Sequence, residues 1–236
     1  MIRTLSIGIV LMLTGLFSSN ALAAGPDFNE MTDYAFNLSG EVITLSVPGR
    51  LDKDFPVKPV LDSVNIYDAD KYSGNYYQKF LLERNWDYKG YFWQVLGRRY
   101  AMMKMTLLLR RMEEESFPNI ADDMLKFKQA MISQIQNENE EENGKEYGII
   151  VGCDQHIVNE VPVLKCTKKN EHPNWKRDVY TSIYMPIRDN IFLEVYFKII
   201  PLGNNKDDDR HKWHPQAMKD IEVIMGSIRR LPQVVK

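Results

Sequence analysis

Cysteine is nearly absent from this sequence, with only two among 236 residues. Two cysteines cannot staple a chain of this length, which excludes the class of small, disulfide-rich secreted proteins. An excess of basic residues is also missing, since 30 Lys and Arg face 32 Asp and Glu, whereas a dedicated nucleic-acid-binding protein is strongly basic. Long apolar runs are limited to one, at the N-terminus, which excludes a membrane protein with several spans.

Recognisable catalytic motifs are lacking as well. The sequence contains no G-x-S-x-G elbow, phosphate-binding glycine loop, dinucleotide-binding fingerprint or H-E-x-x-H zinc motif. Cys153 and His156 lie three residues apart, so in a strand they face opposite sides and form no nucleophile–base pair. We therefore expect a protein that is not an enzyme and that needs no cofactor.

The single apolar run has the features of a secretory signal peptide. Arg3 precedes an apolar stretch over residues 5–17, and the small residues Ala21 and Ala23 provide a peptidase site. The stretch is shorter than the ~20 residues that a membrane-spanning helix needs, although an uncleaved anchor is the alternative. We expect residues 1–23 to be removed and the protein to be exported, to the periplasm if the source is a Gram-negative bacterium, without stable membrane insertion.

Residues 24–236 are expected to form a single domain. The 44% hydrophobic content is enough to fill a core, and no linker rich in Pro, Gly or Ser divides the chain. Residues 40–112 contain a dense tract of aromatic side chains and form a distinct N-terminal subregion of this domain.

The two cysteines occupy matching positions in a predicted hairpin. Residues 148–158 and 161–167 have the pattern of strands that turn at Asn159 and Glu160, which brings Cys153 opposite Cys166. Counted from the turn, this is a non-hydrogen-bonded pair, whose Cα atoms lie about 4.5 Å apart, within the range for a disulfide. An oxidising compartment favours the bond. We predict a structural Cys153–Cys166 disulfide, with two free buried thiols as the alternative.

Residues 179–199 carry the clearest strand pattern, because odd positions are apolar in both halves of the segment. A three-residue loop over residues 188–190 puts both apolar sets on one face, with Leu193 opposite Met185 and Ile191 opposite Ile187. Asn190 is expected to take the left-handed conformation that such a loop requires. The residues that alternate with the apolar set in the second half identify a half-buried strand; they are Phe192, Glu194, Tyr196 and Lys198.

Other strands are expected at residues 42–48 and 61–68, and a second hairpin at residues 88–96 and 100–112. Residues 76–84 are expected to form a short helix.

Two longer helices are predicted from apolar stripes. Pro118 suits the first turn of one and Asn119 can cap it; its stripe is Ile120, Met124, Phe127, Met131 and Ile135. The other opens at His214 and Pro215 and is stopped by Pro232; its stripe is Ala217, Met218, Ile221, Ile224, Met225 and Ile228. The whole pattern predicts an α+β fold, an antiparallel sheet with amphipathic helices packed on it.

One segment is a candidate metal site because it concentrates carboxylates and imidazoles. Its candidate ligands are Asp207, Asp209, His211 and His214. These side chains bind zinc or copper. The alternative is a solvated loop before a helix N-terminus, where acidic residues are favourable.

Acidic and aromatic side chains define a candidate surface for a protein partner. The residues are Glu140, Glu141, Glu142, Tyr76, Tyr77 and Trp93. Acidic clusters can steer a basic partner, and tyrosine and tryptophan dominate interface hot spots. The alternative is an acidic cluster that serves solubility and aromatics that belong to the core.

From residue 118 to residue 231 the order of elements resembles the PsbP-like fold. The closing run from Asp220 to Ile228 is similar to the C-terminal helix of that family, with its Ser-Ile ending. The resemblance implies helices layered on an antiparallel sheet and carries over no functional residue.

An exported chain without catalytic motifs, with acidic clusters and surplus aromatics, is similar in character to periplasmic immunity proteins of type VI secretion systems. That similarity implies a partner that is a secreted toxin or effector enzyme, which the protein binds and neutralises. The alternative is an envelope protein that binds a small ligand or a metal ion.

Overall fold

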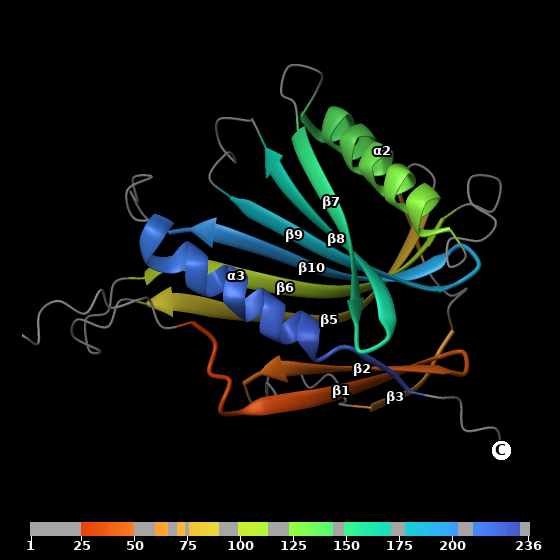
Figure 1. Ribbon diagram of the computed structural model, residues 1–236, viewed down its shortest axis with the longest axis horizontal. Helices are drawn as coiled ribbons and strands as arrows, with labels where there is room; N and C mark the ends of the chain where they lie inside the picture. The colour runs from red at the N-terminus through yellow and green to blue at the C-terminus, as the bar shows by residue number, and fades with distance from the viewer. Residues whose placement is uncertain are drawn as a thin grey trace, which may run out of the picture.

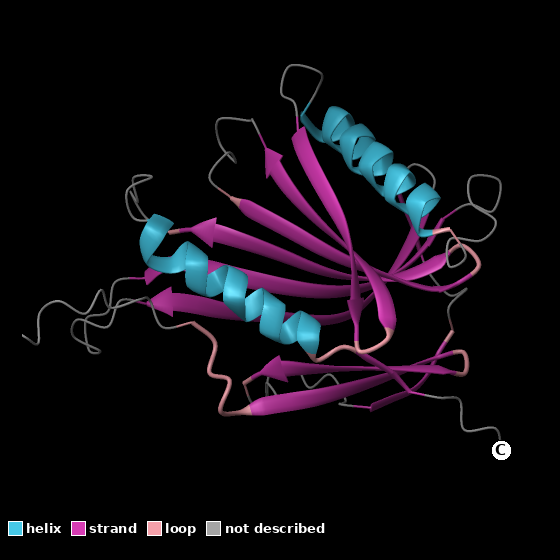
Figure 2. Ribbon diagram, in the orientation of Figure 1, coloured by secondary structure: helices cyan, strands magenta, loops and turns pink. Residues whose placement is uncertain are grey.

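The computed structural model describes residues 25–49, 60–65, 70–73, 76–89, 99–112, 123–143, 149–170, 178–202 and 210–231. Within these residues the chain is mostly antiparallel strand, with two helices (Figure 2). The expected signal peptide lies outside them, so cleavage after Ala23 stays a prediction. No helix among the described residues combines the length and the apolar character needed to cross a membrane.

A seven-stranded antiparallel sheet is the larger unit of the fold, with the strand order β4-β5-β6-β10-β9-β8-β7 (Figure 1). Its strands are β4 (Asp70–Ser73), β5 (Tyr76–Lys89), β6 (Arg99–Met112), β7 (Ile149–Val158), β8 (Val161–Asn170), β9 (Val179–Arg188) and β10 (Ile191–Pro201). The central pair is β6 and β10, which are far apart in the sequence and pair over the length of β10.

A four-stranded sheet in the order β11-β2-β1-β3 is the smaller unit of the fold. Its strands are β1 (Met31–Leu38), β2 (Glu41–Pro48), β3 (Val60–Val64) and β11 (Arg229–Leu231). β1 and β2 form a hairpin that turns at Ser39 and Gly40, both with positive φ, and β3 joins β1 in parallel.

The four-stranded sheet and helix α3 (Arg210–Gly226) together cover one face of the large sheet (Figure 1). The odd-numbered residues of β10 point into this main core, as do Tyr34 of β1 and Trp213 of α3, which is 1% exposed. The expected strand at residues 42–48 is confirmed as β2, but β1 precedes it and β11 follows α3, and neither was expected.

Helix α2 (Met124–Asn143) lies on the opposite face of the large sheet. Phe127, Met131 and Ile135 of its predicted stripe are buried in a second cluster. The strand residues of that cluster are Met112, Cys153, Leu164, Cys166, Tyr184 and Phe192. The helix begins at Met124 rather than near Pro118, because Oδ1 of Asp123 accepts a hydrogen bond from the backbone N–H of Lys126 at 3.0 Å and caps the first turn.

The predicted disulfide hairpin is confirmed. Cys153 pairs with Cys166 across β7 and β8, their Sγ atoms lie 2.02 Å apart, and their Cα atoms lie 4.1 Å apart. The turn contains no glycine, yet Asn159 and Glu160 adopt φ values of 47° and 67°. The side-chain Nδ2 of Asn159 donates to the backbone oxygens of Gly226 and Ile228, both at 2.9 Å, and so ties the hairpin tip to the end of α3.

The β9–β10 hairpin has the expected register over most of its length, with Leu193 opposite Met185. Near the turn the prediction is wrong, because Ile191 pairs with Arg188 rather than with Ile187. Asp189, with φ 47°, takes the left-handed position predicted for Asn190. Asn190 is 3% exposed, and its side chain donates a hydrogen bond to the backbone oxygen of Met112. This hydrogen bond links the β9–β10 turn to the end of β6.

Three other expectations about elements need correction. The expected helix over residues 76–84 is part of strand β5, which pairs with β6 throughout. Helix α3 starts one turn before Pro215, at Arg210, and ends at Gly226. The chain after it is strand β11, so Pro232 does not stop the helix. The sheet-dominated structure therefore supports the predicted α+β class only in outline, with fewer helices and more strands than expected.

Candidate functional site

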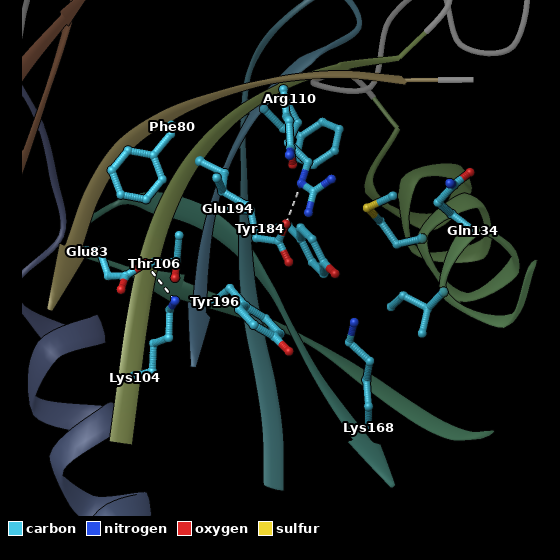
Figure 3. Close-up of a pocket in the computed structure, with 15 residues that line it drawn as sticks. Phe80, Glu83, Lys104, Thr106, Arg110, Gln134, Lys168, Tyr184, Glu194 and Tyr196 are labelled. Carbon is cyan, nitrogen blue, oxygen red and sulfur yellow. Dashed lines mark hydrogen bonds and ion pairs between the residues drawn. The ribbon is translucent and has the colours of Figure 1, made fainter. Parts of the chain in front are cut away.

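Helix α2 covers only part of its face of the large sheet and leaves a cleft beside it (Figure 3). The cleft has a volume of about 380 Å³, within the range of ligand-binding pockets. Its floor comes from β5, β6, β9 and β10, one wall from α2, and one end from β8. The lining residues are Gln78, Phe80, Glu83, Lys104, Thr106, Leu108, Arg110, Met131, Gln134, Ile135, Lys168, Tyr184, Phe192, Glu194 and Tyr196.

A buried ion pair lies on the floor of the cleft. Nε of Arg110 on β6 lies 2.5 Å from Oε2 of Glu194 on β10, and the Glu194 side chain is 3% exposed. Burial acts to raise the pKa of Glu194, but attraction to Arg110 and Lys168 outweighs it, so the pKa lies below its usual value. Glu194 is therefore ionised at neutral pH and forms a fixed negative charge beneath the cleft.

A second ion pair lies at the rim, where Nζ of Lys104 is 2.7 Å from Oε2 of Glu83. The two side chains are 38% and 34% exposed, so water screens this pair far more than the one on the floor. Across the five charged residues that line the cleft, three cations thus face two carboxylates.

The third lining cation, Lys168 on β8, makes no ion pair with any carboxylate among the described residues. Its Nζ lies 5.4 Å from the centroid of the Tyr196 ring, within cation–π range. Tyr196 stacks on Tyr180 with ring centroids 6.3 Å apart. Lys198 lies 5.2 Å from the centroid of the Tyr180 ring and pairs with Asp178 at 3.3 Å.

Sequence reasoning missed this site, although part of its signal was visible. Glu194 and Tyr196 belong to the alternating set of β10, but nothing local shows that α2 folds back over the first part of that face. The even-numbered residues of β10 become more exposed along the strand, because α2 covers only its first part. Phe192 and Glu194 are 1% and 2% exposed, whereas Tyr196 is only half-buried.

The contribution of β5 depends on an irregularity in its pairing. Phe80 pairs with Leu108 and Leu82 with Leu107, so Leu81 is an extra residue. This bulge lets both Phe80 and Glu83 line the cleft, although strict alternation would separate them. The bulge is visible in the sequence as two adjacent apolar residues, Leu81 and Leu82, which are both buried at 5% and 0% exposure.

The structure does not test the predicted partner-binding surface, because among its residues only the side chain of Tyr77 is described. Glu140, Glu141 and Glu142 belong to α2, and Tyr76 and Tyr77 to β5. The Tyr77 ring lies beneath the guanidinium of Arg111 at 4.2 Å, which makes it part of a packed pair. Trp93 lies outside the described residues.

The candidate metal site lies mostly outside the part of the chain that the structure describes. Asp207 and Asp209 lie outside it, and His211 and His214 belong to the start of α3. The ring of His214 packs edge-on against Trp213, with centroids 5.7 Å apart. The described residues contain no group of three or more potential ligands that could hold a metal ion, and metal binding stays a prediction.

Comparisons with protein-family models, curated proteins and solved structures found no match to this chain. The interpretation of the cleft therefore depends on its own geometry and chemistry.

Proposed function

We propose that this chain is an exported binding protein without catalytic activity, and that the cleft beside α2 is where it holds a ligand. The observation that carries the proposal is the incomplete cover of the sheet face by α2, which leaves about 380 Å³ lined by charged, tyrosine and apolar side chains. Charged and polar groups that converge beside aromatic surface can fix the orientation of a ligand. The buried Arg110–Glu194 pair holds the floor in place.

Export to the periplasm is part of the same proposal. The Cys153–Cys166 disulfide supports it, because such bonds persist in oxidising compartments, and so does the signal-peptide pattern of residues 1–23. The PsbP-like layering is likewise a proposal, supported by the presence of a helix on each face of the large antiparallel sheet.

The test is native mass spectrometry of the protein purified from its own envelope, with release of any bound small molecule. Thr106 is 8% exposed and lines the cleft, so Thr106→Phe fills part of the space. Thr167→Phe makes the same change at an exposed position of β8 outside the cleft. We expect wild type and Thr167→Phe to carry a ligand and Thr106→Phe to lose it. A wild-type protein that is empty, and that no envelope metabolite stabilises against heat, would contradict the proposal.

A second candidate function is the neutralisation of a secreted toxin or effector enzyme. One observation favours it: Phe80 lines the cleft yet is 54% exposed, and an exposed large aromatic beside a concavity is what a protein partner buries. In this case a projecting side chain of the effector occupies the cleft, and the acidic residues Glu140, Glu141 and Glu142 of α2 attract a basic partner.

This candidate is tested by co-expressing the chain with a secreted hydrolase encoded beside it and measuring survival. Phe80→Ala should abolish protection, whereas Leu125→Ala, which removes an apolar side chain 61% exposed on α2, should leave it intact. Equal protection by both variants, or a gene with no effector gene beside it, counts against the immunity function.

A further inference from the structure

The charged side chains that line the cleft include three cations and two carboxylates, and the additional cation is Lys168. Arg110 is paired with Glu194 on the floor, and Lys104 with Glu83 at the rim. Lys168 has no carboxylate within ion-pair distance among the described residues, and its ammonium instead lies over the Tyr196 ring. Lys168 attracts Glu194 at longer range, but it is the lining cation with which an entering anionic group can pair without breaking an ion pair among the described residues.

The surroundings of Lys168 are aromatic. The Tyr196 ring is stacked on Tyr180, and Figure 3 shows the side chains of Tyr184, Tyr196 and Lys168 converging on the same part of the cleft. Tyr184 is held edge-on by Phe127 and Phe192, with ring centroids 6.3 Å and 5.8 Å away. Tyr184 is buried and Tyr196 is half-buried. Because its neighbours fix the Tyr196 ring, the protein loses little conformational entropy when a flat ligand packs on it.

Thr106 and Leu108 of β6 form the part of the floor that lies between β5 and Tyr196 of β10. A ring that packs on the exposed part of Tyr196 brings an attached carboxylate within reach of Lys168, whose Nζ lies 5.4 Å from the Tyr196 ring centroid. The negative charge of Glu194 below the floor disfavours a second acidic group deeper in the site.

We propose that the cleft binds small organic monoanions in which a carboxylate is attached to a six-membered ring, with the carboxylate paired to Lys168 and the ring packed against Tyr196. The inference depends on the proposed binding function of the same cleft and names its ligand class. Two sources share this chemistry, aromatic acids and uronic acids, because aromatic side chains pack against the flat face of either ring.

Isothermal titration calorimetry of the mature chain tests the proposal with ligands up to about 10 mM. The probes are 4-hydroxybenzoate for the aromatic acids and glucuronate for the uronic acids. Each has a matched neutral control, 4-hydroxybenzamide and glucuronamide, and acetate supplies the carboxylate without a ring. We expect at least one ring acid to bind, its neutral amide and acetate to bind far more weakly, and the acid that binds to identify the source.

Lys168→Met removes the charge and keeps most of the apolar stem, so we expect it to weaken binding of that acid by roughly 10- to 100-fold. Lys168→Arg should keep the binding, because the positive charge remains. Lys169→Met makes the same charge change at the next residue, which is exposed and does not line the cleft, and should bind like wild type. Circular dichroism and the melting temperature show that each variant is folded.

Three results overturn the proposal: neither acid binds, the amides bind as well as the acids, or Lys168→Met and Lys169→Met have the same effect. If neither acid binds while native mass spectrometry still finds a ligand that Thr106→Phe expels, the ligand class is wrong and the binding function stands. If the cleft is also empty in that experiment, both fail together.

Discussion

The hydroxyl of Tyr88 on β5 donates a hydrogen bond to the carboxylate of Asp220 on α3, with Oη and Oδ2 2.9 Å apart. Both residues are buried, at 0% and 1% exposure, and Nε2 of Gln216 donates to the other carboxylate oxygen at 2.6 Å. Burial raises the pKa of Asp220 although these hydrogen bonds act to lower it. This hydrogen bond fixes α3 to the large sheet. Because the pKa of Asp220 is raised, we expect the stability of the protein to depend on pH.

The sign of this dependence follows from the raised pKa of Asp220. Between the unfolded value, about 3.9, and the higher folded value, the native chain binds more protons at this carboxyl than the unfolded chain does. The free energy of unfolding therefore decreases as the pH rises through that window. The side chain in Asp220→Asn does not titrate. We therefore expect the difference in free energy of unfolding, wild type minus variant, to decrease as the pH rises through this window and to be constant above it. Urea unfolding of both proteins from acid to neutral pH measures it.

The exposed Asp154 of β7 provides the control. Asp154→Asn makes the same chemical change at this exposed position and measures what the substitution itself does to the free energy of unfolding. A difference between wild type and Asp220→Asn that is constant, or that increases with pH, would contradict the assignment of a raised pKa to Asp220.

The Arg110–Glu194 pair should matter to stability far more than the Lys104–Glu83 pair at the same cleft. Arg110→Met leaves a buried carboxylate without its main partner, and we expect a loss of about 3 kcal/mol in the free energy of unfolding. Lys104→Met breaks an exposed pair and should cost less than about 1 kcal/mol. Denaturant unfolding compares the two variants directly.

The double variant Arg110→Met/Glu194→Leu separates pairing from packing. Replacing both charges by apolar side chains should restore most of the stability lost in Arg110→Met, because no buried charge remains. A double variant as unstable as the single one would show that the loss came from packing around Arg110.

The disulfide should stabilise the β7–β8 hairpin beneath α2. Its sequence separation is 13 residues, for which chain-entropy arguments give about 3 kcal/mol. Cys153→Ala/Cys166→Ala should therefore unfold at lower urea, and reductant should lower the stability of wild type without affecting the variant. If reductant lowered the stability of both proteins equally, its effect would not come from the Cys153–Cys166 disulfide.

Asn159 has two functions in its turn that substitutions can separate. Asn159→Gly keeps the positive φ and loses the two hydrogen bonds to the end of α3, which should cost about 1 kcal/mol each. Asn159→Ala loses the same hydrogen bonds and keeps a Cβ in the left-handed region without the polar side chain that makes asparagine tolerant of it, so we expect it to be about 1–2 kcal/mol less stable than the glycine variant. Thermal unfolding should rank the stabilities as wild type, glycine, alanine. Equal stability of the glycine and alanine variants would show that φ at this position relaxes.

The sequence predicts the fold well where pairing is local. In the β7–β8 and β9–β10 hairpins the turn and the apolar alternation lie within about twenty residues, so the register of Cys153 with Cys166 and of Leu193 with Met185 could be read directly. β5 was mistaken for a helix because the bulge at Leu81 interrupts its alternation.

The cleft could not be predicted in this way, because it arises from contacts between distant segments. Glu194 is buried since α2, about 60 positions earlier, crosses that part of the sheet and stops short of Tyr196. Lys168, Glu83 and Arg110 come from three further strands, and only the strand order of the large sheet brings them together. Residue type alone marked none of them, since each is an ordinary charged residue on a strand.

The pairing of β11 with β2, which sets Arg229 opposite Thr44 and Leu231 opposite Val42, has a kinetic consequence. The small sheet cannot be completed until the chain has been made as far as Leu231, and such distant pairings slow folding. For a protein that is exported as we propose, this delay is useful. Under that proposal, we expect the small sheet to close only after Leu231 has crossed the membrane.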